Sequence, residues 1–199
     1  MKRLYSKGLT TCSGGNVSCR PAENRILITA SSIDKGYLRA KHIAVLTPDG
    51  NNLTPGLKTS IESGMHLEIY RNRPDIGAVV HAHPLHASLF TASKRKIRTD
   101  ILAEARFMLG DPVVAPYALM GTDSLAEIVG RTFRDTSVSV VLMENHGIIT
   151  VGRNLHHAYD RIEVLEAAAR MTLMGELLGD ISFLTEERRS AIDQMHQGT

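Results

Sequence analysis

The most informative stretch of the sequence for the fold is Ile76-Gly77-Ala78-Val79-Val80-His81-Ala82-His83-Pro84. Residues 76–82 are almost entirely apolar, which predicts a strand buried on both faces of a sheet. Side chains alternate along a strand, so His81 and His83 are expected on the same face. Pro84 cannot donate to the next ladder bond and ends the strand there. The stretch therefore predicts a buried strand that carries two imidazoles at its end.

Periodicity on either side of this strand predicts an α/β protein. Further strands are expected at residues 25–29, 43–47, 113–115, 138–143 and 147–151. Helices are expected at residues 59–71, 85–93, 99–109, 122–134, 155–178 and 186–195. The last two strand runs are separated only by residues 144–146, which favours antiparallel neighbours. With 199 residues and 43% hydrophobic content, the chain is long enough for one domain spanning residues 1–199.

Charge and hydropathy argue against nucleic acid and membrane partners. The formal net charge is +2, with 23 basic and 21 acidic side chains spread along the sequence, which leaves no basic footprint for DNA or an anionic membrane. No apolar run approaches the roughly 20 residues that cross a bilayer. The basic residues 1–5 have no apolar segment behind them, as a secretory signal would require. A cytoplasmic location is expected.

Three histidines form a candidate metal centre. His146 follows the apolar run of residues 138–143, and Gly147 beside it permits a tight turn and close backbone approach. Together with His81 and His83 it would offer three imidazoles and one open coordination position, the set that catalytic zinc requires. Other divalent first-row metals also accept three imidazoles. The alternative is that each histidine is an ordinary polar residue satisfied by its neighbours.

Glu62 is the candidate acid or base. It lies in the first turn of the helix expected at residues 59–71, where a glutamate can equally stabilise the helix dipole or cap the helix. For proton transfer beside a metal, its pKa would have to be raised toward neutrality, or the metal would have to release it when the substrate arrives.

A loop rich in small residues is a candidate anion site. Residues 10–18 read Thr-Thr-Cys-Ser-Gly-Gly-Asn-Val-Ser, with backbone donors suited to a concave nest. A Gly-Gly turn before a strand is also a common chain reversal, and this is not a Walker loop. Two more hydroxyl clusters, Ser31-Ser32 and Thr59-Ser60, follow in the sequence. The three turns could close around one phosphate.

Five motifs resemble those of the class II aldolase/adducin family, and they follow one another along the chain in the same order. They are residues 13–18, 28–32, 58–62, 81–84 and 144–147. The resemblance covers residues 8–179 and is greatest to the branch that cleaves L-fuculose 1-phosphate. It implies a three-layer αβα sandwich around a largely antiparallel sheet, assembled as a homotetramer with active sites between subunits. It also implies that His81, His83 and His146 bind Zn²⁺ and that Glu62 is the catalytic acid/base. The phosphate of the substrate would be held by Gly15, Asn16, Ser31, Ser32 and Ser60.

The implied activity is cleavage of a ketose 1-phosphate to dihydroxyacetone phosphate and an aldehyde. Related lyases of the same fold stay open as alternatives, namely a methylthioribulose-phosphate dehydratase or a sugar-acid phosphate decarboxylase. The 4-epimerase branch resembles the same pattern with aspartate in place of Glu62, which counts against it. A non-catalytic adducin-like module is a further alternative, against which the retained histidines and Glu62 argue.

Three features depart from the pattern of the fuculose-phosphate branch. Ile61 stands where that branch has a second phosphate-binding serine before the glutamate. An aliphatic stretch around Leu102 replaces a tyrosine that donates a proton to the leaving aldehyde. Only residues 1–7 precede the glycine loop, where the family has a longer helix, as expected of a truncated or misassigned start.

Overall fold

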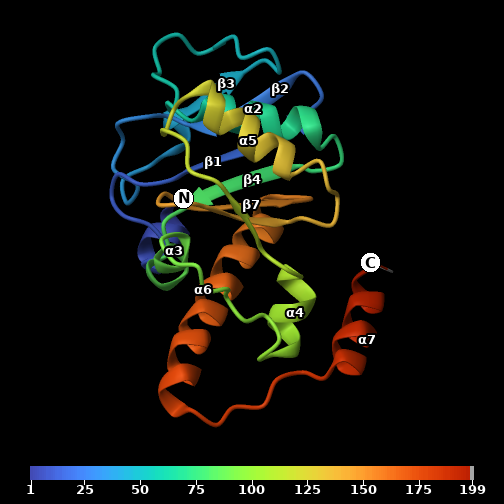
Figure 1. Cartoon of the computed structure of the whole chain (residues 1–199). Helices are drawn as coiled ribbons and strands as arrows, with labels where there is room; N and C mark the ends of the chain where they lie inside the picture. Colours follow the sequence, from blue (N-terminus) through green and yellow to red (C-terminus); the bar gives the residue numbers. More distant parts are fainter. Residues whose placement is uncertain (198–199) are drawn as a thin grey trace.

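The computed structural model describes residues 1–197, in which seven strands form one mixed sheet (Figure 1). The strand order is β3-β2-β1-β4-β7-β6-β5. Only β5 and β6 pair in parallel, and the other neighbours are antiparallel. The strands are β1 (Asn16–Ala22), β2 (Arg25–Thr29), β3 (Ile43–Leu46), β4 (Ala78–Ala82), β5 (Val113–Ala115), β6 (Val140–Met143) and β7 (Gly147–Gly152).

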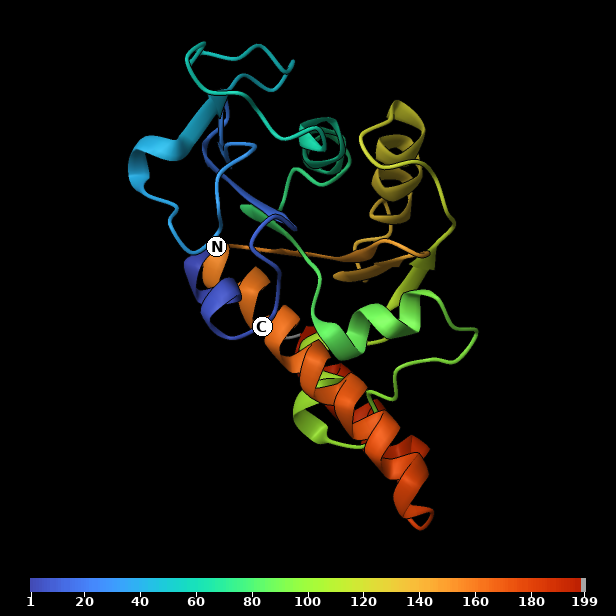
Figure 2. The same cartoon turned by 90° about the vertical axis from the view of Figure 1, so that its left-hand side faces the viewer.

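Helices cover both faces of the sheet. They are α1 (Lys2–Ser6), α2 (Ser63–Asn72), α3 (Leu85–Thr91), α4 (Ala103–Leu109), α5 (Asp123–Thr132), α6 (Leu155–Leu178) and α7 (Glu186–Gln197), with a short 3₁₀ turn η1 (Ala40–His42). Figure 2 shows α2 and α5 side by side on one face, and α3 and α6 on the other. None of the helices in the described part of the chain combines the length and apolar character that a membrane crossing requires.

The alternation of strand side chains divides the core into two clusters. Val79 of β4 packs with α2 and α5, whereas its neighbours Ala78 and Val80 pack with α6. His81 therefore points to the same side as Val79, toward the layer that contains α2. Across the β1–β4 pair, Asn16 is the direct partner of His81. The glycine loop, which leads into β1, therefore lies against the end of β4 that carries His81 and His83.

The expected elements are present, with different boundaries at several ends. The run at residues 76–82 pairs only from Ala78, and the helix expected at residues 99–109 begins at Ala103, because Leu102 before it is extended. The helix expected from residue 59 begins at Ser63, so Glu62 occupies the N-cap and not the first turn. The antiparallel pairing of β6 with β7 is confirmed.

Strand β1 and helix α1 were not predicted. Residues 16–22 of β1 are buried only in their first half, and the register with β2 is irregular between Cys19 and Ala22. Pro21 and Arg20 break the alternation that marks a strand in the sequence. Helix α1 has five residues, which is too short to give a periodic signal.

Candidate metal centre and its carboxylate

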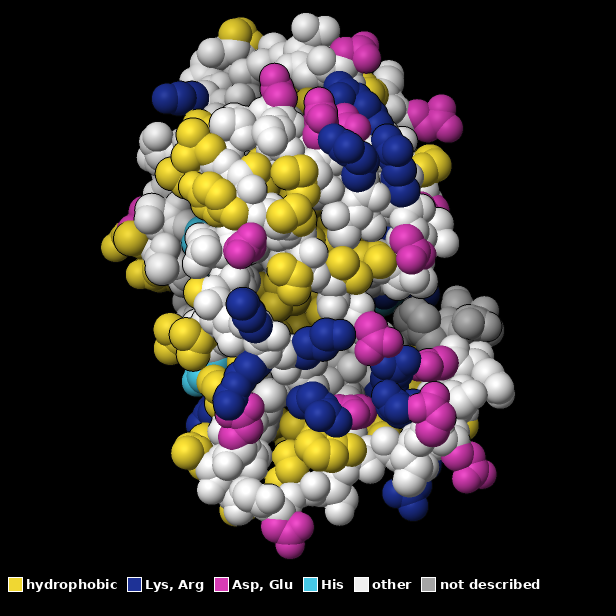
Figure 3. All heavy atoms as spheres, in the orientation of Figure 1, with side chains coloured by type: hydrophobic (Ala, Val, Ile, Leu, Met, Phe, Trp, Pro, Cys, Tyr) yellow, Lys and Arg dark blue, Asp and Glu magenta, His cyan; other side chains and the backbone are white. Residues whose placement is uncertain are grey.

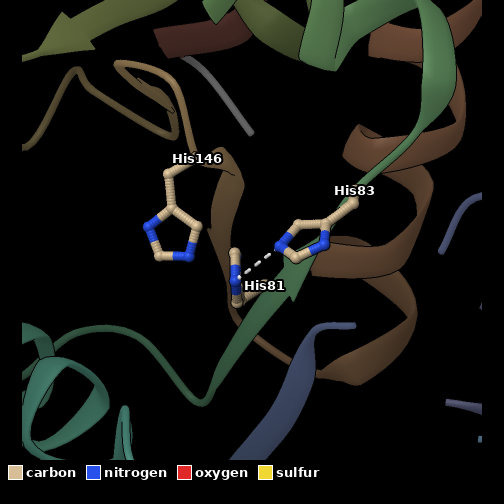
Figure 4. A group of neighbouring side chains, drawn as sticks. All are labelled: His81, His83 and His146. Atoms are coloured by element: carbon tan, nitrogen blue, oxygen red, sulfur yellow. Dashed lines mark hydrogen bonds between the residues drawn. The ribbon is translucent and has the colours of Figure 1, made fainter. Parts of the chain in front are cut away.

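The three histidines predicted as metal ligands lie together (Figure 4). His81 belongs to β4, His83 follows directly after that strand, and His146 lies in the turn between β6 and β7. One ring nitrogen from each histidine lies within 4.8 Å of the other two. The Nε2 atoms of His81 and His83 are 3.1 Å apart. Segments far apart in the sequence therefore meet at a single point at the sheet end.

Hydrogen bonding and burial prepare these rings as ligands. The Nδ1 atom of His81 donates to the carbonyl oxygen of Ile148 at 2.9 Å, which leaves Nε2 with its lone pair. Burial lowers the pKa of His81, and burial together with the neighbouring His81 and His146 lowers the pKa of His83 to about 3. Neutral imidazole is the form that coordinates a metal ion.

Two glycines and one left-handed backbone position determine where the rings of His83 and His146 lie. A Cβ atom at Gly147 would lie 2.4 Å from Cδ2 of His83, and one at Gly14 would lie 2.6 Å from its Nδ1 atom. Glycine is needed at both positions because the ring fills the space of any side chain. Asn145 adopts φ 51°, a left-handed conformation that asparagine tolerates, and this turns the chain so that His146 faces β4.

The Glu62 carboxylate lies beside the three rings. Its Oε1 atom is 2.9 Å from Nε2 of His146, and its Oε2 atom is 3.4 Å from Nε2 of His81. Although Glu62 is the N-cap of α2, its side chain makes no capping hydrogen bond. The capping interpretation is therefore wrong, because the carboxylate points to the histidines instead.

The same surroundings keep Glu62 ionised. Burial raises its pKa, but the close imidazoles of His146 and His81 and the hydrogen bond from Asn16 outweigh that effect and hold the pKa well below its usual range. A glutamate that transfers a proton beside a metal needs either a raised pKa or release from the metal when the substrate arrives, and the pKa of Glu62 is not raised. Glu62 is a carboxylate that can accept a proton.

The donor set fits a divalent ion such as zinc. Three neutral imidazoles converge with a carboxylate at the edge of the cluster, a combination of nitrogen and oxygen ligands that suits zinc and similar first-row ions. Among the residues that the structure describes, the buried Nδ1 atom of His146 has no hydrogen-bond partner. The other ring nitrogen, Nε2, faces Glu62 and the centre of the cluster.

The residues expected to hold a phosphate are partly assembled. Asn16 donates from Nδ2 to Ser60 Oγ at 3.0 Å and to Glu62 Oε2 at 2.7 Å. The Ser31 amide donates to the carbonyl oxygen of Lys58, which ties the second hydroxyl cluster to the third.

The other two residues of the expected phosphate site have left-handed backbone conformations. Ser32 is exposed and has φ 59°. Gly15 has φ 71°, and a Cβ atom there would lie 2.5 Å from the His81 carbonyl oxygen.

Two further buried polar residues near the centre were not predicted as functional. Lys35 is only 4% exposed, and its backbone N–H donates to the Cys12 carbonyl oxygen of the glycine loop. Burial lowers the pKa of its ammonium group, and the nearby carboxylates of Glu62 and Asp34 oppose that shift. His66, predicted as a packing or supporting residue, is fully buried. A single lysine in a turn gives no pattern in a sequence, so only the fold could place Lys35 here.

A small group of exposed apolar side chains begins next to Glu62 in the sequence. Ile61, directly before Glu62, is 57% exposed and lies beside Gly121, while Leu119 and Met120 are also exposed. Figure 3 shows hydrophobic side chains over the face that the segment before α5 crosses. Ile61 therefore belongs to an apolar surface and not to a hydroxyl cluster.

Comparisons with known proteins show the family to which the chain belongs. The family model described as the Class II Aldolase and Adducin N-terminal domain matches residues 1–173. A protein of Methanococcus maripaludis named L-fuculose phosphate aldolase is 35% identical over 84% of this chain and 89% of its own. A Haemophilus influenzae protein named 3-oxo-tetronate 4-phosphate decarboxylase is 29% identical over 93% of this chain and 88% of its own. A solved structure of an L-fuculose 1-phosphate aldolase, 28% identical, has a TM-score of 0.87 and covers 98% of this chain and 92% of its own.

Fold and site together define an α/β metalloenzyme whose three-histidine centre carries an adjacent glutamate. The chain belongs to the class II aldolase and adducin family. Within that family it is a lyase of the metal-dependent aldolase type.

Proposed function

We propose that the chain is a zinc-dependent aldolase that cleaves a ketose 1-phosphate, such as L-fuculose 1-phosphate, to dihydroxyacetone phosphate and an aldehyde. The observation that carries this proposal is the position of the Glu62 carboxylate, 2.9 Å from Nε2 of His146 and 3.4 Å from Nε2 of His81. A proton-transferring group is thus held beside the ligand atoms of a three-imidazole site. The named activity of the Methanococcus maripaludis relative supports the same substrate class.

His81, His83 and His146 would hold the zinc ion. When bound, the ion supplies a Lewis acid for the substrate oxygens, so no Schiff-base lysine is required. Glu62 moves the proton. As the C3–C4 bond breaks, the C4 hydroxyl loses one proton and C3 gains one. A carboxylate that is ionised at rest can accept the first proton and return it to C3, which balances the reaction.

The phosphate would bind where the three polar turns meet, held by Gly15, Asn16, Ser31, Ser32 and Ser60. Asn16 and Ser60 are joined by a hydrogen bond, and Ser31 is tied to the segment of Ser60 through Lys58. Lys35 is the only lysine that is buried among the described residues. A cation with little solvent around it attracts a phosphate more strongly than an exposed one does.

We further propose a cytoplasmic homotetramer with active sites between subunits. The support is the exposed apolar surface of Ile61, Leu119 and Met120, which begins at the residue next to Glu62. Burial of such a patch favours association, and a subunit docked there would adjoin the site. Light scattering coupled to size exclusion gives the mass directly. A monomeric, fully active chain would contradict this assembly.

Product analysis tests the aldolase proposal. The zinc-loaded chain is incubated with L-fuculose 1-phosphate and with ribulose 1-phosphate, and dihydroxyacetone phosphate is measured by its coupled reduction with NADH. We expect release of dihydroxyacetone phosphate that depends on zinc and is lost in Glu62→Gln. If the active chain releases none from any ketose 1-phosphate, the proposal is wrong.

A decarboxylase of a sugar-acid phosphate is the second candidate. Two observations favour it: the similarity to the Haemophilus influenzae protein, and Leu102, which cannot exchange a proton with the C4 oxygen that becomes the aldehyde. A decarboxylase would break the C1–C2 bond of a 3-oxo-tetronate 4-phosphate, releasing carbon dioxide and leaving dihydroxyacetone phosphate after C2 gains a proton. It would release no aldehyde, and it would form no dihydroxyacetone phosphate from a ketose 1-phosphate. The dehydratase alternative would release water from methylthioribulose 1-phosphate without breaking a carbon–carbon bond.

A further inference from the structure

A line of buried polar side chains leads from Glu62 into the protein between β1 and α2. Asn16 and Ser18 lie on β1, and His66 and Tyr70 lie on α2. Each of these four is at most 4% exposed. Metal ligation and phosphate binding do not require His66, Ser18 or Tyr70, so the buried polar groups call for another role.

The polar side chains of β1 and those of α2 are spaced at similar distances along their elements. Asn16 and Ser18 are two residues apart on a strand, a rise of about 6.8 Å. Glu62, His66 and Tyr70 are four residues apart along a helix, a rise of about 6 Å per step. The strand partners of Asn16 and Ser18 are His81 and Val79, which face the α2 layer. The side chains of β1 and α2 therefore interdigitate.

Hydrogen bonds join these side chains in one continuous chain. Asn16 Nδ2 donates to Glu62 Oε2 at 2.7 Å, and Asn16 Oδ1 bonds to His66 Nε2. Ser18 Oγ lies 2.7 Å from His66 Nδ1 and 2.9 Å from the Tyr70 hydroxyl. Both ring nitrogens of His66 are thus committed to this chain.

Chemistry fixes the direction of every bond. An ionised carboxylate can only accept, so the NH₂ group of Asn16 faces Glu62 and its Oδ1 atom faces His66. His66 must then donate from Nε2, and as a neutral ring it accepts at Nδ1. Ser18 has one hydroxyl hydrogen and gives it to His66, so Tyr70 donates to Ser18. Burial lowers the pKa of His66 to about 3, in agreement with a neutral ring.

We propose that His66 is a positioning residue of this site, which holds the Asn16 amide so that its NH₂ group faces Glu62 and fixes that carboxylate for proton transfer. The role in catalysis rests on the proposed function. If Asn16 turned over, its oxygen would face the carboxylate and its NH₂ group would face the N–H of His66, with both hydrogen bonds lost. Ser18 and Tyr70 act through His66 by fixing its tautomer.

Replacements of His66 by amides test this role. In His66→Gln the terminal nitrogen reaches the place of Nε2 and can still donate to Asn16. In His66→Asn the side chain is shorter and reaches only the place of Nδ1, so it keeps the bond to Ser18 and loses the one to Asn16. The two variants are of similar polarity, so a merely structural role would affect both alike.

We expect His66→Asn to lower kcat about tenfold to hundredfold, within the usual contribution of general acid–base catalysis, with KM and zinc content little changed. His66→Gln should retain most of kcat. Equal kcat values in the two folded variants would overturn the proposal.

A readout without activity separates this inference from the aldolase proposal. Nitrogen-15 NMR of the histidine rings reports which nitrogen carries the proton. We expect His66 in the wild-type chain to be protonated at Nε2 only, and Tyr70→Phe to produce a mixture of tautomers. A wild-type ring protonated at Nδ1 would overturn the inference even in an active aldolase. An inactive wild type with the expected tautomer would refute the proposed function alone.

Discussion

The Oε1 atom of Glu62 lies 2.9 Å from Nε2 of His146, so the carboxylate stands directly against the ring of the third histidine. Replacing Glu62 by Gln preserves the shape of the side chain but removes its ability to accept a proton. We expect kcat to fall by about 10²- to 10⁴-fold, with zinc content unchanged by metal analysis. Glu104→Gln, at an exposed position, is the control and should retain full activity. Retained activity in Glu62→Gln would remove Glu62 from its role.

Loss of a histidine ligand should remove the metal. We expect His83→Ala to bind zinc at least tenfold more weakly and to have no measurable turnover, because two imidazoles and a carboxylate remain where the site needs three rings. His156→Ala, at an exposed position in the first turn of α6, should change neither property. Chelation should likewise abolish activity, and added zinc should restore it. Equal zinc affinities in the two variants would contradict the assignment of His83.

A change at Gly147 tests the packing around His83 without replacing any of the three histidines. The methyl group of Gly147→Ala would meet Cδ2 of His83 at 2.4 Å, so the ring must shift. We expect zinc affinity to fall by roughly tenfold or more, as for changes in the surroundings of metal ligands. Gly64→Ala introduces the same group in α2 with open space around it and should bind zinc normally. Competition with a chromogenic chelator measures both affinities.

Lys35 should affect substrate binding more than turnover. We expect Lys35→Met to raise KM for a ketose 1-phosphate by roughly tenfold, the magnitude of a lost hydrogen bond between charged groups. Lys41→Met, at an exposed position, should leave KM unchanged. A fall in kcat with KM unaltered would show that Lys35 acts on Glu62 and not on the phosphate.

His66 should make the stability of the metal-free chain depend on pH. Its pKa is about 3 in the fold, against 6.5 for an ordinary histidine. Below pH 6.5 the unfolded chain therefore binds a proton that the folded chain does not, so the free energy of unfolding falls as pH falls. The contribution is about 1.4 kcal/mol per pH unit. Urea denaturation between about pH 7 and about pH 5 should show a weaker pH dependence for His66→Gln. Parallel curves for the two proteins would contradict the buried neutral ring.

The sequence predicts those parts of the site that follow a regular period. His81 and His83 are found because side chains alternate along a buried strand, and His146 because it ends a second apolar run. The long helix α6 has the predicted bounds, since Asn154 caps its start and Gly179, in a left-handed conformation, ends it.

The remaining parts depend on contacts between distant elements. Lys35 becomes significant only when its turn lies against the glycine loop, and β1 is hidden by Pro21 and an irregular register. The chain of bonds through His66 needs the spacing of a helix to match that of a strand beside it. The exact start of α2 puts Glu62 at the N-cap position, from which its side chain leaves the helix and faces the histidines, and element ends are where periodicity is least informative.

Asn16 and His81 are direct partners across β1 and β4. A slip of β1 by one residue against β4 would turn Asn16 to the opposite face, away from the Glu62 carboxylate, and would shift Gly14, which leaves the space for the His83 ring. We therefore expect metal binding to require the correct register between β1 and β4. Metal uptake during refolding should mark the moment at which the N-terminal strand has found its place.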